Sequence, residues 1–142
     1  MNLPCARQSV QSEIELLSNM LKKDGYRVDQ FHKKGNGIKS LLQSTGRLTD
    51  FKGLFIFFKP DNFKVFVGES ENVLREIQKI ARCQRKKDQD YLMNIAESNG
   101  LNTIEDGQSY LLTMNVHWIE IIQRNKRLTL CRAIQSTNFS IL

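Results

Sequence analysis

The stretch Gly53–Ile80, GLFIFFKPDNFKVFVGESENVLREIQKI, decides the fold. Its first six residues favour a β-strand, because aromatic and branched side chains suit a pleated sheet. Lys59–Asn62 predicts a turn, since proline presets φ and Asp and Asn tolerate turn geometry. The run Phe63–Val67 predicts the second strand of a hairpin, which Gly68 ends, and we expect a helix to start near Ser70.

The first strand of this hairpin is apolar on both faces. Phe55 and Phe57 alternate with Leu54, Ile56 and Phe58. A strand that is apolar on both sides is typical of the centre of a sheet whose two faces are both covered. Strand alternation therefore predicts that these aromatic rings pack in the core and do not stack on nucleobases.

The order of two strands and a helix resembles the GIY-YIG nuclease family. Gly53-Leu54-Phe55 stands where the family has G-I-Y, and Phe66-Val67-Gly68 stands where it has Y-I-G or Y-V-G. The run Glu69–Leu74 looks like the family's segment that enters its first helix. In the family, the two motif tyrosines lie at the active site, and one helps to activate the attacking water.

The reactive groups that the resemblance implies are not matched. Both motif positions are phenylalanine, Phe55 and Phe66, and a phenyl ring has no hydroxyl with which to bind or move a proton. The family's helix arginine falls at Glu76, and Arg75 lies one residue earlier, which turns a side chain by about 100° around a helix. A shorter loop would restore Arg75 to the site, whereas Glu76 would repel phosphate.

The metal-binding glutamate of the family also lacks a counterpart. The nearest local match is Leu130–Ile134, where Cys131 stands at the glutamate position. Magnesium prefers hard oxygen ligands, and a thiol is a poor substitute. Glu120, the one acidic residue after Asp106, falls in a predicted strand over Val116–Ile122. We expect no metal and no other cofactor, with Mg²⁺ needed only if the protein is a divergent, active nuclease.

Composition bounds the class of protein. The 142 residues suit one domain, and no run approaches the roughly 20 apolar residues of a membrane span. The net charge of +6 favours polyanionic partners. Three widely spaced cysteines, Cys5, Cys83 and Cys131, argue against a disulfide scaffold or a zinc site. Met1–Arg7 has no apolar core of a secretory signal, so we expect a cytoplasmic or nuclear protein that binds no membrane.

The remaining pattern predicts an α/β (α+β) fold with a small mixed or antiparallel central sheet flanked by helices. Residues 1–50 are expected to form an N-terminal helical extension packed on the core, and residues 51–142 the GIY-YIG-like domain. The other predicted elements are a helix over Val10–Lys23, a strand over Tyr26–Phe31, helices over Ile38–Ser44 and from the hairpin through Lys87, a helix over Asp90–Ser98, strands over Tyr110–Met114 and Val116–Ile122, and a helix over Asn125–Ser136.

A set of basic residues after the hairpin is the candidate binding site. They recur at helical spacing, so on one continuous helix they would share a face. The set is Arg75, Lys79, Arg82 and Lys86, with Arg85 and Lys87 beside them and Lys33, Lys34, Lys39 and Arg47 as an extension. Such a face binds phosphates in a salt-dependent way and positions nucleic acid without reading its sequence. The other interpretation is a solvated helix surface.

Three functions follow as hypotheses. The leading one is a nonenzymatic nucleic-acid-binding or regulatory protein, a pseudoenzyme on a nuclease-like scaffold, with DNA as the favoured ligand. The second is a divergent but active GIY-YIG endonuclease that cleaves DNA phosphodiesters, with Arg75 as the phosphate ligand. The third is a protein-interaction module whose positive charge serves an acidic partner.

Overall fold

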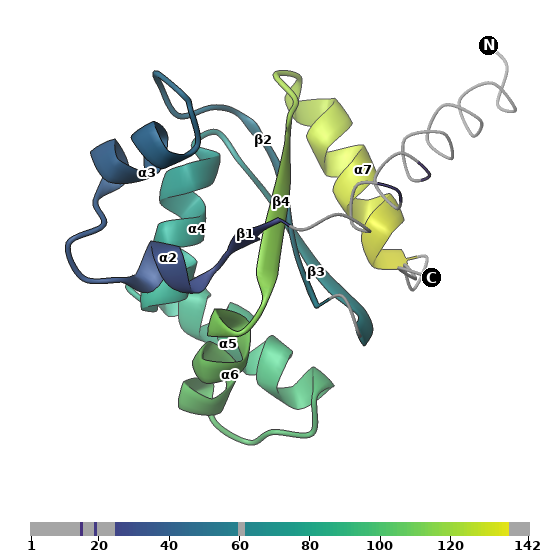
Figure 1. Ribbon diagram of the computed structural model, residues 1–142. Coiled ribbons are helices and arrows are strands. Elements are labelled where there is room, and N and C mark those ends of the chain that lie inside the picture. Colours follow the sequence, from purple (N-terminus) through teal and green to yellow (C-terminus); the bar gives the residue numbers. More distant parts are fainter. Residues whose placement is uncertain (1–14, 16–18, 20–24, 60–61, 137–142) are drawn as a thin grey trace, which may run out of the picture.

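The computed structural model describes Glu15, Asn19 and residues 25–59 and 62–136 (Figure 1). The helix predicted over Val10–Lys23 lies outside these residues, apart from Glu15 and Asn19, which are both helical. No helix within the described ranges has the length and hydrophobicity needed to cross a bilayer.

The chain folds as an antiparallel four-stranded sheet with helices on both faces, which confirms the expected α+β class. The strand order is β1-β4-β2-β3. In sequence order the elements are β1 (Tyr26–Arg27), α2 (Asp29–His32), α3 (Ile38–Ser44), β2 (Gly53–Lys59), β3 (Asn62–Ser70), α4 (Val73–Arg82), α5 (Lys86–Ser98), α6 (Ile104–Leu112), β4 (Asn115–Glu120) and α7 (Arg124–Ser136).

The predicted hairpin is confirmed, and its first strand lies inside the sheet. β2 pairs with β3 on one side and with β4 on the other. Phe55 and Phe57 enter a core shared with α4, α5 and α6, whereas Leu54, Ile56 and Phe58 enter a second core under α7. Of the labelled helices, Figure 1 shows α7 on one side of the sheet and α2 to α6 on the other. The apolar character of both strand faces therefore reflects burial on both sides.

The helix predicted to run from the hairpin through Lys87 is wrong, because it is two helices. α4 ends at Arg82, and Cys83 adopts a left-handed conformation with φ 54°. α5 then begins at Lys86, where the Asp88 carboxylate accepts a hydrogen bond from the backbone N–H of Arg85 at 2.9 Å. A residue in the left-handed conformation ends a helix, and the carboxylate three positions into α5 stabilises the next start.

Two predicted strands are also corrected. Tyr110–Met114 belongs mainly to helix α6, whose first turn is capped by the Thr103 hydroxyl, which accepts from the N–H of Asp106 at 3.0 Å. A short apolar run fits either periodicity, and here the cap and the packing on α5 select the helix. The strand predicted over Tyr26–Phe31 is real only at Tyr26–Arg27, since α2 follows.

Residues 25–44 contribute to the same core as the hairpin. β1 pairs with Val116 and Asn115 at the edge of the sheet. Val28, Phe31 and Leu41 are buried in the core that α4 covers. This part of the chain therefore supplies an edge strand and two short helices, α2 and α3, that lie against α4.

Candidate nucleic-acid interface

The two motif phenylalanines lie on neighbouring strands, and their rings belong to the core. Phe55 is opposite Gly68 in the register, and Phe66 is opposite Phe57. The Phe55 ring covers Gly68 so closely that a Cβ added there would lie 2.2 Å from Cζ. Phe55 is only 2% exposed, and Phe66 packs against the same core. The Phe55 position is therefore filled by packing and presents nothing to a ligand.

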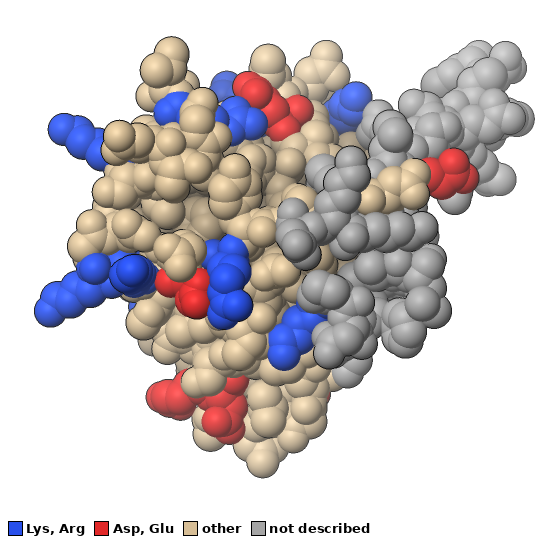
Figure 2. All heavy atoms as spheres, in the orientation of Figure 1, with Lys and Arg blue, Asp and Glu red and all other residues tan. Residues whose placement is uncertain are grey.

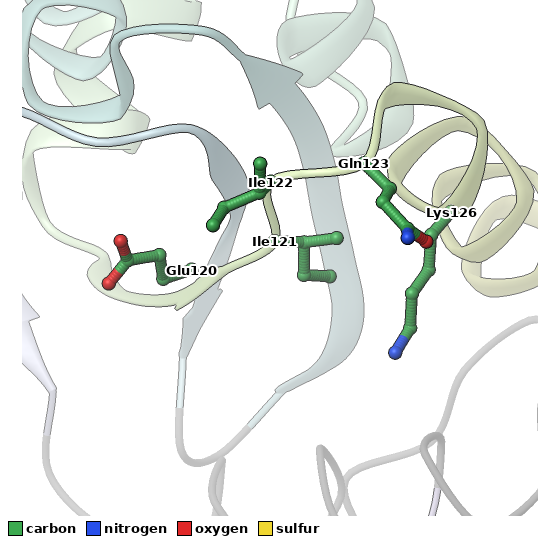
Figure 3. A pocket seen from close by; sticks show the side chains of 5 residues that line it. All are labelled: Glu120, Ile121, Ile122, Gln123 and Lys126. Atoms are coloured by element: carbon green, nitrogen blue, oxygen red, sulfur yellow. The ribbon is translucent and has the colours of Figure 1, made fainter.

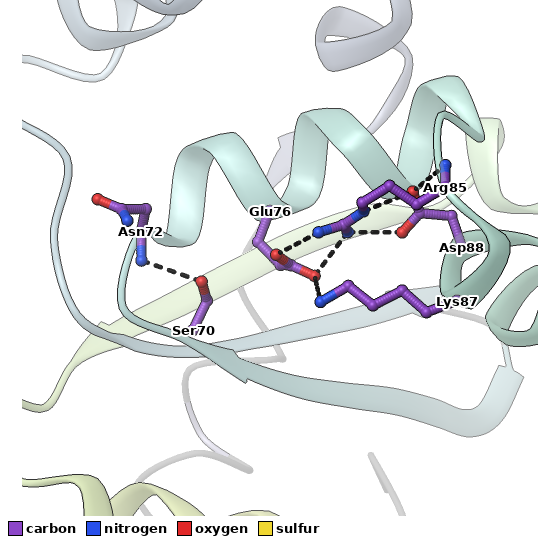
Figure 4. A network of polar contacts seen from close by, with 6 residues as sticks. All are labelled: Ser70, Asn72, Glu76, Arg85, Lys87 and Asp88. Carbon is purple, nitrogen blue, oxygen red and sulfur yellow. Dashed lines mark hydrogen bonds and ion pairs between the residues drawn. The ribbon is translucent and has the colours of Figure 1, made fainter.

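At the start of α4, Arg75 and Glu76 have different environments. Arg75 is exposed and forms no side-chain ion pair within the described ranges. The Glu76 side chain is 17% exposed and accepts two hydrogen bonds from the Arg85 guanidinium, at 3.1 and 2.8 Å (Figure 4). Lys87 Nζ lies 3.4 Å from the same carboxylate. Glu76, and not Arg75, is thus the residue held in a part-buried site.

Arg85 connects Glu76 to Asp88 and thereby links α4 to α5. Its guanidinium donates to both Asp88 oxygens, at 2.9 and 2.6 Å, and the Asp88 side chain is 1% exposed. These hydrogen bonds to carboxylates raise the pKa of Arg85 further above its ordinary value. For Glu76, burial raises the pKa, but the hydrogen bonds and charge of Arg85 and then Lys87 outweigh burial and leave the pKa below 4.5. Both carboxylates of this network therefore accept hydrogen bonds from the Arg85 guanidinium.

The N-terminus of α4 is capped by a residue that sequence reasoning missed. The Asp50 carboxylate accepts hydrogen bonds from the N–H of Leu74 at 2.9 Å and of Arg75 at 3.0 Å. It also accepts from the N–H of Phe51 at 2.8 Å. No local pattern could have found this cap, because Asp50 is 24 residues from Leu74. The backbone donors that attract anions at a helix start are therefore occupied by a carboxylate of the protein itself.

The loop between α2 and α3 is bound to one face of α4. Arg82 donates to the carbonyls of Phe31 at 3.2 Å, Lys33 at 3.3 Å and Asn36 at 3.0 Å. Gln78 donates to the carbonyl of Asn36 at 3.1 Å. Arg82 thus satisfies carbonyls of a glycine-containing loop, and it places that loop beside the exposed residues of α4.

This docking brings basic side chains from three segments to one side of the molecule. We call the set the cationic surface; its members are Lys33 and Lys34 of the loop, Lys39 of α3, and Arg75 and Lys79 of α4. All five are exposed, and no ion pair is found for any of them among the residues that the structure describes. Figure 2 shows Lys and Arg side chains projecting from the side of the molecule formed by α2 and α3. The surface offers uncompensated positive charge to solvent.

The prediction that these basic residues share one face of a continuous helix is wrong, because α4 ends at Arg82 and α5 begins at Lys86. The helix break moves Lys86 to α5, where it pairs with Asp90 at 3.4 Å. Arg85 and Lys87 are engaged by Glu76, and Arg82 by the loop carbonyls. In the described part of the chain, only Arg75 and Lys79 of that set have neither an ion pair nor a side-chain hydrogen bond, since Arg82 has no ion pair but donates to backbone carbonyls.

Arg47, which the sequence offered as an extension of the basic face, is engaged as well. It pairs with Glu120 at 3.3 Å and lies 3.7 Å above the Phe51 ring centroid. Glu120 is correspondingly an exposed residue at the end of β4 with a cationic neighbour.

A shallow pocket lies elsewhere, between the end of β4 and the start of α7. It encloses about 520 Å³ and is lined by Glu120, Ile121, Ile122, Gln123 and Lys126. Figure 3 shows the two isoleucines between Glu120 on one side and Gln123 with Lys126 on the other. The charged groups do not converge on a common point, so the pocket lacks the few precisely placed polar groups of a small-molecule site.

The position that the family resemblance assigns to a metal ligand is occupied by Cys131 on α7. Burial, and then the charge of Glu69, raise the pKa of this thiol above its ordinary value, so the group is neutral at pH 7. Among the described residues, no group of three His, Cys, Asp or Glu side chains is placed to hold a metal ion.

Comparison with known proteins does not assign the chain to a family. A scan against protein-family models, a search of curated proteins and a search of solved structures each find no match. The function is therefore argued from the geometry of the site.

Proposed function

We propose that this chain is a nonenzymatic nucleic-acid-binding protein built on a GIY-YIG-like scaffold, with DNA as the favoured ligand. The observation that carries the proposal is the cationic surface, where basic residues far apart in the sequence come together without acidic partners. Surface lysines and arginines are usually balanced by nearby carboxylates, as Lys52 is by Glu71 at 3.6 Å. A cluster without such balance is suited to a polyanion.

The proposed contacts are to phosphates. Each cation that neutralises a phosphate releases counterions, which supplies affinity that falls steeply as salt rises. Lysine and arginine contacts of this kind fix the position of the nucleic acid but carry no sequence information. Binding at the cationic surface is therefore expected to be strong at low salt and weakly selective for sequence.

The state of the motif positions supports a binding role without catalysis. Cleavage of a phosphodiester needs an activated nucleophile and stabilisation of the developing charge. Phe55 is buried and carries no ionisable group, and Glu76 puts negative charge where the resemblance would place an arginine. An active but divergent nuclease remains the competing proposal, with exposed Arg75 as its phosphate ligand.

Two assays separate the candidate functions. Filter binding to DNA and RNA at about 50 and 200 mM salt should show binding at the lower salt that weakens strongly at the higher one. Absence of binding at the lower salt would favour a module for an acidic protein partner. Nicking of supercoiled and branched DNA should be undetectable; reproducible Mg²⁺-dependent nicking that disappears in Arg75→Ala would establish the nuclease instead.

A further inference from the structure

One exposed aromatic ring lies on β1, the strand that precedes α2 and the lysine-bearing loop between α2 and α3. Tyr26 of β1 is 42% exposed, and it is the only aromatic residue among the exposed large hydrophobic residues in the described ranges. Its ring stacks on Trp118 of β4, with ring centroids 4.6 Å apart and planes inclined by 13°. Because Trp118 covers one face of the Tyr26 ring, the exposed area belongs to the opposite face and the rim.

The indole ring of Trp118, on which Tyr26 stacks, is held in place by the core. Phe31 meets Trp118 edge-on with centroids 6.2 Å apart and an interplanar angle of 81°. Phe51 lies on the indole at the same centroid distance, tilted by 53°. Trp118 is thus packed between core rings and Tyr26, and it supports Tyr26 as a flat, pre-positioned surface. A rigid aromatic surface loses little conformational entropy when a ligand stacks on it.

Helix α2 connects this ring to the cationic surface. Phe31, the α2 residue that packs on Trp118, offers its carbonyl to Arg82 of α4 at 3.2 Å. In the chain, Phe31 is followed by His32 and then by Lys33 and Lys34. Phe31 of α2 thus joins the Tyr26–Trp118 ring pair to the segment that carries these lysines, so a strand bound there can extend to the exposed face of Tyr26.

We propose that Tyr26 is a stacking platform for an unpaired nucleobase, so that the ligand of this protein is single-stranded nucleic acid or a structure with a single-stranded segment. The inference rests on the proposed function and adds the class of ligand to it. Bases of a duplex hide their faces within the helical stack, whereas unpaired bases expose them to aromatic side chains. Stacking is tolerant of sequence, since every base has a π-face.

The test compares one oligonucleotide of about 12 nucleotides, a length within the usual site size of single-strand-binding domains, with a hairpin duplex of the same sequence. Affinities are measured by fluorescence anisotropy for wild type, Tyr26→Leu, Tyr26→Phe and Lys79→Gln. Tyr26→Leu should weaken single-strand binding by about tenfold or more and leave duplex binding unchanged. Tyr26→Phe keeps the ring and should bind as wild type does, and Lys79→Gln should weaken both forms.

Trp118 gives a second readout, because it is the only tryptophan in the chain. Single strands should change its fluorescence, and duplex should change it less at equal occupancy. Unchanged single-strand affinity in Tyr26→Leu, or an equal loss for both forms, overturns the inference and leaves the proposed function standing. If Tyr26→Leu fails to fold, the test uses Trp118 fluorescence in wild type and Tyr26→Phe. A fluorescence change that is the same for single strand and duplex then overturns the inference. Absence of any binding by wild type at low salt overturns the proposed function itself.

Discussion

Removing two charges from the cationic surface should change the salt dependence of binding in a calculable way. The perturbation is Lys33→Gln with Lys79→Gln, one residue from the loop and one from α4. Both are exposed and have no ion pair in the described ranges, so their replacement breaks no ion pair there. The change therefore acts on the surface charge and leaves the packing of α4 intact.

The magnitude follows from counterion release. With about 0.9 counterions released per neutralised phosphate of B-DNA, five contacts lower affinity about 500-fold when salt rises fourfold. With three contacts left, the same rise in salt lowers affinity only about 40-fold. The double variant should thus bind duplex DNA more weakly at low salt and lose affinity less steeply as salt increases.

The assay is filter binding across a salt series between about 50 and 200 mM, with a matched control. Lys52→Gln with Lys86→Gln also removes two positive charges, but these lysines are paired with Glu71 and Asp90 and lie outside the cationic surface. The control should keep the slope of wild type. Equal slopes in the two double variants would refute the assignment of the phosphate contacts to the cationic surface.

Three further predictions concern contacts that hold the fold together. Arg127→Met should destabilise the fold by about 3–5 kcal/mol in urea unfolding, because it leaves Glu69, paired with it at 2.9 Å, without its buried partner. Gly68→Ala should cost about 1–3 kcal/mol through overpacking against the Phe55 ring, and Phe55→Leu should reduce that cost in the double variant. Glu76→Gln should destabilise the protein at neutral pH, but the difference from wild type should shrink as pH falls below 4.5, because a carboxyl whose pKa is lowered by folding stabilises only while ionised.

Each of these substitutions has a control variant that should leave stability unchanged. Arg132 is exposed on α7, so Arg132→Met should leave the urea midpoint unchanged. Gly37 has no atom within 4 Å of an added Cβ, so Gly37→Ala should be tolerated. Glu97 is exposed on α5, and Glu97→Gln should not alter the pH profile of unfolding. A loss in a control as large as in its test variant would contradict the contact assigned to the test residue.

The hairpin could be predicted because its signals are local. The turn residues at Lys59–Asn62 and the alternation of apolar residues in β2 act between close neighbours, and they set the pairing of Phe57 with Phe66. The end of α4 could not be predicted, since Cys83 carries no residue-type signal for a left-handed conformation. For α6, the apolar run at Tyr110–Leu112 fits a strand or a helix, and contacts with α5 decide.

The amino-acid sequence by itself determined the hairpin, the α+β class, the positive charge and the phenylalanines at the motif positions. Only the tertiary structure decided which cations remain available. Docking of the α2–α3 loop on α4 uses Arg82, which binds the Lys33 carbonyl, while Arg85 is bound by the carboxylates of Glu76 and Asp88. These contacts join residues from different segments, and a charge is free or paired according to what lies near it in space. Spacing along one helix therefore predicted that the surface is positively charged, but it did not predict which residues form the cationic surface.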